Sequence, residues 1–314
     1  MASKTPSHAD RRRILVTGAT GMIGSTLCNA LIDRGDQVIG VSRNPEKAAT
    51  AQPRVEWHAW EPTMERPSDK ALEGVDAVVN LAGEPINQRW NDDVKDRIAR
   101  TRIKATKNLA DAIATLDDPP KIFISGSAIG FYGDRGDELL YEDAAPGDDF
   151  LADVVVKWEA AANSMSDCGV RVATIRTGHV LDPRGGLLGE LLTPFKLGVG
   201  GPIASGKQYM SWIHRHDEIG ILLWALDNEA ARGPINATAP NPVTNKDFSK
   251  QLGKALNRPA IAPIPGFAIK AIRGPEFGQV LTEGQRVYPR NATENGYEFK
   301  QPELEGALAN LLRK

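Results

Sequence analysis

The chain has 314 residues, a hydrophobic fraction of 41% and a charged fraction of 25%, which are typical of a folded globular protein rather than a disordered one. The formal net charge of -2 comes from interspersed acidic and basic residues, and it excludes the broad basic field that nucleic acids and anionic membranes require. We therefore expect a small-molecule partner, with no nucleic-acid or membrane partner. The sequence leaves the oligomeric state open.

The first 11 residues are polar and basic, and we expect them to form a flexible N-terminus. No apolar run precedes the first predicted strand, and no later stretch approaches the length of a membrane span, so the sequence predicts a cytoplasmic protein. The two cysteines of the chain give no support for a disulfide framework.

The first half of the chain alternates short apolar runs with amphipathic helical patterns. This alternation is typical of βαβ units, and it predicts an α/β fold of the Rossmann type with a doubly wound parallel sheet. Strands are expected at 13–17, 37–41, 54–58, 77–80, 121–125 and 170–175. Helices are expected at 22–34, from Asn91 onward as N-cap, and from 150 to about 167.

From Gly178 the pattern changes, because glycines punctuate a stretch with little periodicity, which suggests loops that form a substrate lid. Asp217 then opens a predicted helix, and a strand at 234–238 returns the chain to the sheet. The predicted nucleotide-binding domain therefore comprises 12–177 plus about 212–239. A smaller, discontinuous substrate lobe comprises about 178–211 plus 240–314, and within it Thr244 and Asp247 resemble a capping box.

The strongest motif is a glycine-rich loop between the first strand and the first helix. Its residues are Gly18, Ala19, Thr20, Gly21, Met22, Ile23 and Gly24. Small residues allow a tight turn and close backbone approach, while the helix N-terminus presents free N–H groups and a partial positive charge to a pyrophosphate. The strand-loop-helix context predicts that this loop binds a dinucleotide.

The residues after the second strand indicate which dinucleotide is bound. An Asp or Glu at this place holds the ribose 2′-hydroxyl of NAD, and that acid is missing. The chain offers Ser42 and Arg43 instead, a hydroxyl and a guanidinium suited to a 2′-phosphate, so we expect NADP(H). The alternative is that Arg43 is a solvated surface charge paired with Glu46.

Further segments carry a family resemblance. The loop spacing, the segment from Asn80 to Gly83 and the segment from Ser125 to Ser127 resemble the extended, epimerase-like branch of the short-chain dehydrogenase/reductase superfamily. The segments at 80–86, 157–161, 200–203, 211–214 and 236–240 are similar to its atypical cell-division-inhibitor-like members, over about residues 12 to 312. The resemblance implies an NADP(H)-binding domain and a small C-terminal substrate lobe. It also extends the cofactor site to Leu81, Ala82, Gly83, Arg102 and Val180.

The superfamily's usual acid/base device is a Tyr four residues before a Lys on one helix, with a Ser that orients the substrate. The resemblance assigns Ser127 and Lys157 to this device, but Asp153 stands at the Tyr position. Asp153 and Lys157 form either a helix salt bridge, the simpler interpretation, or a catalytic pair. As proton donor we nominate Tyr132 first and Asp153 second, because an Asp beside Lys157 is ionised and a poor acid.

Glu84 and His214 are further candidates for the substrate pocket, although either side chain also fits a purely structural role. The run from His214 to Asp217 invites a metal site, but adjacent residues rarely converge on one ion, and we expect no metal. The sequence as a whole predicts an NADP(H)-dependent oxidoreductase or epimerase-like enzyme for an unidentified small molecule. The alternative, favoured by the missing Tyr, is a non-catalytic NADP(H)-responsive binding or regulatory protein.

Overall fold

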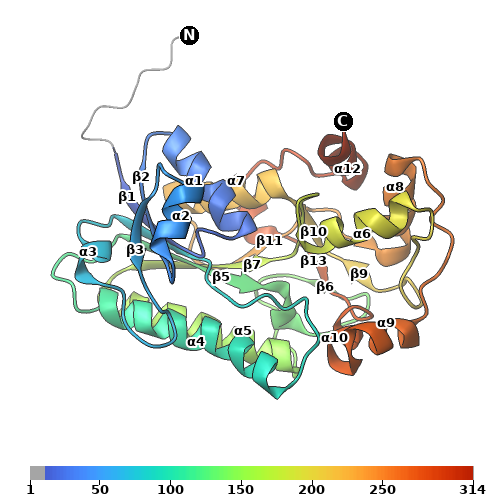
Figure 1. Ribbon diagram of the computed structural model, residues 1–314, viewed down its shortest axis with the longest axis horizontal. Coiled ribbons are helices and arrows are strands. Elements are labelled where there is room, and N and C mark those ends of the chain that lie inside the picture. Colours follow the sequence, from blue (N-terminus) through green and yellow to red (C-terminus); the bar gives the residue numbers. More distant parts are fainter. Residues whose placement is uncertain (1–10, 314) are drawn as a thin grey trace, which may run out of the picture.

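A seven-stranded parallel sheet forms the centre of the computed structural model, which describes residues 11–313 (Figure 1). Of the N-terminal segment predicted to be flexible, residues 1–10 lie outside the described residues. The strand order is β11-β7-β5-β4-β1-β2-β3. The bounds of these strands are β1 Arg13–Thr17, β2 Gln37–Ser42, β3 Glu56–Ala59, β4 Ala77–Asn80, β5 Ile122–Ala128, β7 Arg171–Thr177 and β11 Gly233–Ala237. The predicted Rossmann-type sheet is confirmed.

Helices cover both faces of the sheet, as a doubly wound fold requires (Figure 1). On one face α1 (Met22–Asp33) and α7 (Arg215–Asp227) pack side by side, and they bury Leu27 and Leu222 against strand residues. On the other face α4 (Asp92–Ile113) packs along α5 (Phe150–Asn163), and Leu109 and Ala162 join the core there. Within residues 11–313, no helix is both long enough and apolar enough to cross a membrane.

Most predicted boundaries agree with the structure to within a few residues. Asn91 caps α4, since its side chain accepts a hydrogen bond from the Val94 N–H. Asp149 caps α5 in the same way, and the predicted helix to about residue 167 divides into α5 and the 3-10 helix η3 (Ser164–Cys168). β5 and β7 extend further than predicted, because their last residues pair with each other beyond the apolar run that marks them in sequence.

The segment 178–211 is not the loop that its glycines suggested. It contains β8 (His179–Leu181), which pairs with β10 (Trp212–His214), and the helix α6 (Gly186–Lys196). Leu188, Leu192 and Phe195 of α6 are buried in the core of the lobe. Glycines at the helix start and Pro194 in its last turn obscure the apolar period, which is why the sequence did not predict α6.

Beyond β11 the chain builds most of the small lobe. Its core joins α6 to α8 (Asn245–Leu256) and α12 (Leu304–Leu312), while α9 (Gly266–Arg273) and α10 (Pro275–Val280) pack against each other at its lower edge (Figure 1). Thr244 is the N-cap of α8, because its Oγ1 accepts from the Asp247 N–H at 3.2 Å, while the Asp247 carboxylate accepts from the Thr244 hydroxyl at 2.6 Å. The remaining elements are α2 Pro45–Ala51, α3 Asp69–Leu72, η2 Ile129–Tyr132, β6 Leu139–Leu140, β9 Tyr209–Met210, β12 Val243–Thr244, β13 Arg286–Val287 and α11 Arg290–Glu294.

Buried Asp217 attaches the C-terminal segment to the nucleotide half. Its carboxylate accepts hydrogen bonds from the backbone N–H groups of Lys300 and Gln301, at 2.7 Å and 2.9 Å, and from the Tyr297 hydroxyl at 3.2 Å. α11 lies along β11, where Ala292 joins the core beneath α1 and α7. The chain therefore leaves the small lobe and returns to the sheet before it ends in α12.

Candidate functional site

The glycine-rich loop is built so that only small residues fit. Gly18 has a φ of +65°, and a Cβ there would lie 2.6 Å from the Leu81 carbonyl oxygen. A Cβ on Gly24 would lie 2.2 Å from the Gly18 carbonyl oxygen, so this glycine lets α1 start directly on the strand. Gly21 has no such close neighbour, and it caps the helix with its backbone open to the cavity described below. The first-turn N–H groups of α1 are the donors that an anion would meet.

A buried hydrogen-bond chain fixes the backbone that follows β4. Thr17 Oγ1 donates to Asn80 Oδ1 at 2.7 Å and accepts from the N–H groups of Leu81 and Ala82, both at 3.1 Å. Asn80 Nδ2 donates in turn to Thr106 Oγ1 at 2.8 Å. The end of β4 is thereby held against Gly18, at the point where the strand order reverses and α/β sheets bind their ligands.

Arg102 supports the next turn of this loop. Its guanidinium donates to the Glu84 carbonyl oxygen at 2.9 Å and lies 5.3 Å from the Trp158 ring centroid. A Cβ on Gly83 would lie 3.1 Å from the guanidinium carbon, so Gly83 lets the arginine pass close to the backbone. Burial lowers the pKa of Arg102 to about 10, which leaves it charged at neutral pH. The charge lies directly beneath the Ala82–Gly83 turn.

At the end of β2 the structure presents Arg43 to solvent. Its predicted alternative partner, Glu46, forms no ion pair with it among the described residues, and Ser42 Oγ accepts from the Asn44 N–H at 3.1 Å. β2 is parallel to β1, so its end lies beside the glycine-rich loop. Arg43 is therefore available to a ligand that extends from this loop.

A cavity of about 790 Å³ opens between the sheet edge and the small lobe, and its far walls come from α6 and α10. Thr20, Gly21, Met22 and Ile23 line one end, and Val180 lies beside them. Gly18, Gly24, Ser42, Arg43, Leu81, Ala82, Gly83 and Arg102 lie outside the lining, on the loops around this end. Of the predicted cofactor residues, five thus border the cavity directly.

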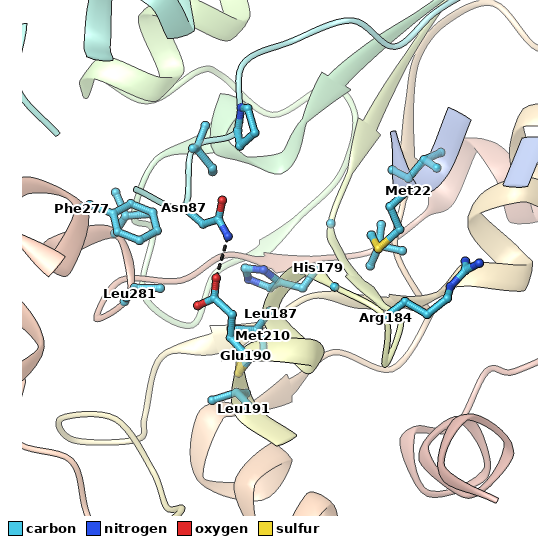
Figure 2. A pocket seen from close by; sticks show the side chains of 18 of the residues that line it. Met22, Asn87, His179, Arg184, Leu187, Glu190, Leu191, Met210, Phe277 and Leu281 are labelled. Atoms are coloured by element: carbon cyan, nitrogen blue, oxygen red, sulfur yellow. Dashed lines mark hydrogen bonds between the residues drawn. The ribbon is translucent and has the colours of Figure 1, made fainter. Parts of the chain in front are cut away.

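His179 and Arg184 are among the lining residues that the sequence did not predict. The imidazole of His179 points into the cavity beside Asn87 and Glu190 (Figure 2), and burial lowers its pKa to about 4, so the ring is neutral at pH 7. Arg184 donates to Thr26 Oγ1 of α1 at 3.1 Å and pairs with buried Asp182. Arg184 could have been identified in the sequence, because it directly precedes the Gly185-Gly186 pair after a strand. No local sequence pattern indicates that His179 lines the cavity.

Glu190 of α6 joins three elements across the cavity mouth. It accepts a hydrogen bond from Asn87 Nδ2 at 2.6 Å (Figure 2) and forms an ion pair with Arg273 of α9. A second ion pair, Lys95 to Glu276 at 3.1 Å, joins α4 to α10 nearby. The loop after β4 is thus attached to α6, and the helix α4 that follows it is attached to α10.

Two of the predicted catalytic residues belong to a buried network instead of the cavity lining. Ser127 Oγ donates to Glu159 Oε1 at 2.5 Å, and Arg176 donates to both oxygens of Glu159 at 2.8 Å. Arg176 also donates to the Tyr132 hydroxyl at 3.0 Å, and that hydroxyl donates to Asn236 Oδ1 at 2.6 Å. Tyr132 is fully buried and burial raises its pKa to about 12. Tyr132, nominated as the first proton donor, therefore lies in the core and outside the lining of the cavity.

Asp153 and Lys157 form the salt bridge of the simpler interpretation. Lys157 Nζ lies 2.7 Å from Asp153 Oδ2 on the surface of α5, and both side chains are more than half exposed. Neither residue belongs to the lining of the cavity. In this structure the four predicted catalytic residues are thus engaged with other protein groups.

Glu84 and His214 do not face the cavity either, which corrects both expectations. Glu84 accepts from Gln88 Nε2 at 3.1 Å, while its neighbours Pro85, Ile86 and Asn87 provide the lining. His214 is buried and caps α7, since its Nδ1 accepts from the His216 N–H at 3.0 Å. In the described part of the chain, no three His, Cys, Asp or Glu side chains come together as a metal site.

Glu218 is a buried carboxyl directly behind the glycine-rich loop. Its Oε1 accepts from Thr177 Oγ1 at 2.9 Å, and its Oε2 has no partner in residues 11–313. Burial raises the pKa of Glu218 to about 7. The carboxyl borders a small void of about 10 Å³ that Met22, Ile23 and Val180 also line, so its charge state acts next to the start of α1.

Comparison with known proteins agrees with this geometry. Residues 14–237 match the NAD dependent epimerase/dehydratase family, and residues 264–311 match a domain of unknown function, DUF1731. The human epimerase family protein SDR39U1 is 38% identical over 304 residues, which cover 96% of this chain and 99% of the relative.

Solved structures agree as well. A crystal structure of human SDR39U1 isoform 2 with NADPH has a TM-score of 0.86 at 38% identity, and the match covers 95% of this chain and 98% of that one. A nucleoside-diphosphate sugar epimerase from Corynebacterium glutamicum has a TM-score of 0.79 at 34% identity, over 96% of this chain and 58% of that one. The chain therefore belongs to the NAD dependent epimerase/dehydratase family, within the atypical extended short-chain dehydrogenase/reductase group that its motifs predicted.

Proposed function

We propose that the chain is an NADP(H)-dependent oxidoreductase or epimerase-like enzyme that acts on a small molecule. The observation that carries this proposal is the shared cavity, because the glycine-rich loop and the apolar walls of the small lobe line the same space. A dinucleotide on the loop and a substrate in the lobe then lie next to each other, which is the arrangement that hydride transfer requires.

The cofactor assignment rests on fit. Gly18 and Gly24 make room that a Cβ would fill, and the backbone of Thr20, Gly21, Met22 and Ile23 borders the space where a pyrophosphate would lie. Exposed Arg43 with Ser42 suits the 2′-phosphate of NADP(H). The human relative, crystallised with NADPH, supports the same choice.

The residues of this chain then have distinct tasks. Leu81, Ala82 and Gly83, held by Thr17 and Arg102 on the loop after β4, and Val180 in the cavity lining would hold the nicotinamide end of the cofactor. When bound, NADPH supplies a hydride. Neutral His179 offers a hydrogen bond to a substrate oxygen from the far side of the cavity. Ser127 holds the surrounding structure through buried Glu159, whereas Lys157 pairs with Asp153 on the surface of α5.

We further propose the domain division 12–177 plus about 212–239 for the nucleotide half, and about 178–211 plus 240–314 for the substrate lobe. Separate hydrophobic cores support it, since one core gathers on the sheet and another gathers between α6, α8 and α12. Residues 290–301 return from the lobe to cover the sheet edge.

Isothermal titration calorimetry with NADPH and NADH tests the cofactor assignment. Because a guanidinium-phosphate contact is charge-assisted, NADPH is expected to bind at least about tenfold more tightly than NADH. Arg43→Ala is expected to reduce that preference. The variant Arg54→Ala, whose side chain pairs with Asp33 on the same half, serves as control and is expected to keep it. Equal affinities in the parent protein would contradict the assignment.

A non-catalytic NADP(H)-responsive role is the second candidate. It is favoured by one observation, that Ser127, Tyr132, Asp153 and Lys157 are all bonded to protein groups outside the cavity lining. A panel of aldehydes, ketones and quinones with NADPH separates the two. The enzyme proposal expects NADPH oxidation with at least one of these compounds. Tight NADPH binding without any oxidation above background would favour the regulatory role.

A further inference from the structure

The half of the cavity that faces away from the glycine-rich loop is apolar. Its walls come from α6, α10 and the strands and loops between them, and they are formed by Leu187, Leu191, Ile203, Met210, Phe277 and Leu281. Leu191, Met210, Phe277 and Leu281 surround the same space from different sides (Figure 2). Apolar walls of this kind stabilise a ligand by removing apolar surface from water.

The polar side chains in this half are mostly bonded to the protein. Asn87 donates to Glu190, and Gln208 Nε2 donates to the Ile203 carbonyl oxygen at 3.1 Å. Asn245 Oδ1 accepts from the Ile203 N–H at 2.7 Å. A ligand that needs many hydrogen bonds would have to break these contacts, and each broken contact would leave a buried polar group unpaired.

The charges in this half are also unsuited to an anion. Glu190 and Glu283 are the charged residues of the lining here, and both are carboxylates. The cation in the described lining is Arg184, which lies at the glycine-rich loop and pairs with Asp182. Arg273 compensates the charge of Glu190 from outside the lining. A diphosphate in this half would lose its water and find no cation in the described lining beside it, which is unfavourable in a partly buried site.

Two polar side chains of this half keep an unbonded group: Gln208, whose Oε1 is buried without a partner in the described residues, and His179. The His179 ring has no hydrogen-bond partner within residues 11–313, and it points into the cavity where Asn87 and Glu190 meet (Figure 2). Its backbone is fixed, because β8 pairs with β10 and the His179 N–H donates to the Ser211 carbonyl oxygen at 2.8 Å. The ring is thus a rigidly placed polar group in apolar surroundings.

We propose that the substrate is an uncharged, largely apolar carbonyl or alcohol compound whose oxygen bonds to His179, and not a nucleoside diphosphate sugar. This inference rests on the proposed function, since it places the substrate beside the NADP(H) site. It assigns His179 as the residue that selects for one oxygen within an otherwise apolar ligand.

Binding to the NADP⁺-saturated protein tests this, because NADP⁺ cannot reduce a ketone and no turnover interferes. Benzophenone, an uncharged aromatic ketone, is compared with UDP by isothermal titration calorimetry. Benzophenone is expected to bind at least about tenfold more tightly than UDP. A lower Kd for UDP, or no measurable binding of benzophenone, overturns the proposed substrate class.

A charge placed in the apolar wall gives the second arm. Leu191→Arg is expected to weaken benzophenone binding by at least about tenfold, since a cation replaces apolar surface in the cavity wall, and to keep the Kd of NADP⁺ within about twofold. Leu197→Arg is the matched control at the C-cap of the same helix, because Leu197 is exposed and lies outside the lining. Unchanged benzophenone binding in Leu191→Arg would place the ligand elsewhere and overturn the inference.

The third arm isolates His179. Diphenylmethane has the shape of benzophenone without its oxygen. His179→Phe is expected to weaken benzophenone by about tenfold and to leave diphenylmethane unchanged or tighter, because only the ketone loses a hydrogen bond. An equal loss for both ligands overturns the role of His179. Failure of the parent protein to bind NADP⁺ at all contradicts the proposed function itself, whereas NADP⁺ binding with a preference for UDP contradicts this inference alone.

Discussion

Ser127 donates its hydroxyl hydrogen to Glu159, at an Oγ to Oε1 distance of 2.5 Å, in the interior of the protein. The same carboxylate accepts two hydrogen bonds from Arg176, so its charge is compensated within a buried group. A serine that the family resemblance assigns to substrate binding is here part of the structural core. The residues that line the cavity are therefore the better candidates for contact with a substrate.

The buried network predicts a large loss of stability when its cation is removed. Arg176→Met leaves the Glu159 charge buried without a partner, and the free energy of unfolding is expected to fall by about 3 to 5 kcal/mol. Urea denaturation measures the change. Lys107→Met serves as control, because its ion pair with Asp111 is exposed, and a loss of no more than about 1 kcal/mol is expected there. Similar losses for both variants would contradict the structural role of the network.

Gly21→Val separates cofactor binding from folding. The backbone of Gly21 has a φ of -77°, and the closest atom to an added Cβ is the Gly18 carbonyl oxygen at 3.2 Å, so the variant is expected to fold. The added methyl groups occupy space that the pyrophosphate needs, and NADPH is expected to raise the melting temperature of the parent protein but not of the variant. Gly306→Val, at an exposed position of α12, is expected to keep the shift. A normal shift in folded Gly21→Val would show that the phosphates bind elsewhere.

Glu218 predicts a specific pH dependence. Its pKa is raised from 4.5 to about 7 in the folded protein, so between these values the folded state holds more protons than the unfolded state, and stability falls as the pH rises. Glu218→Gln removes this proton linkage. The variant is expected to gain stability relative to the parent as the pH rises from 4.5 to above 7, by about 2 to 3 kcal/mol in all. Urea denaturation across this range measures it, and a difference that does not vary with pH would contradict the burial of a titrating carboxyl.

The pair of Asp153 and Lys157 is expected to contribute little. Because both side chains are exposed and lie four residues apart on α5, Asp153→Asn and Lys157→Ala are each expected to change the free energy of unfolding by less than about 0.5 kcal/mol. NADPH titration of Lys157→Ala gives the functional readout, with a change in Kd of less than about threefold expected. A loss of about tenfold or more would mean that Lys157 leaves Asp153 to reach the cofactor.

Local patterns were sufficient to predict much of the fold and one end of the site. The glycine-rich loop can be recognised in the sequence because two of its positions require glycine. A Cβ on Gly18 would clash with the Leu81 backbone, and a Cβ on Gly24 would clash with the Gly18 backbone. The central strands β1 and β4 are mostly apolar and buried, since both faces of the sheet are covered there. Arg43 could be identified because the acid expected at that strand end was missing.

The substrate end depended on contacts that no local pattern contains. Tyr132 follows a strand that ends near the site, but its hydroxyl is hydrogen-bonded to Arg176 and Asn236. These residues lie 44 and 104 positions away in the chain. His179 faces the cavity because β8 pairs with β10, a pairing between segments that looked like loop and strand in the sequence. The helix α6 was not predicted for a related reason. Its glycines interrupt the helical pattern in the sequence, and its apolar face is stabilised by packing in the core of the lobe, with segments far away in the chain.

The bonds that Asp217 makes to residues near the C-terminus mean that the two halves of the molecule are connected at several points along the chain. The chain leaves the seven-stranded sheet after β7 and rejoins it at β11, while β8 and β10 pair with each other outside that sheet. A further connection forms where the Lys300 and Gln301 N–H groups bond to Asp217 of the helix α7. A single cut therefore cannot release the lobe, and a lobe from a relative cannot be exchanged as one continuous piece. A hybrid with altered substrate choice would have to transfer 178–211 and the segment after 240 together, while it keeps the partner groups of Asp217 in place.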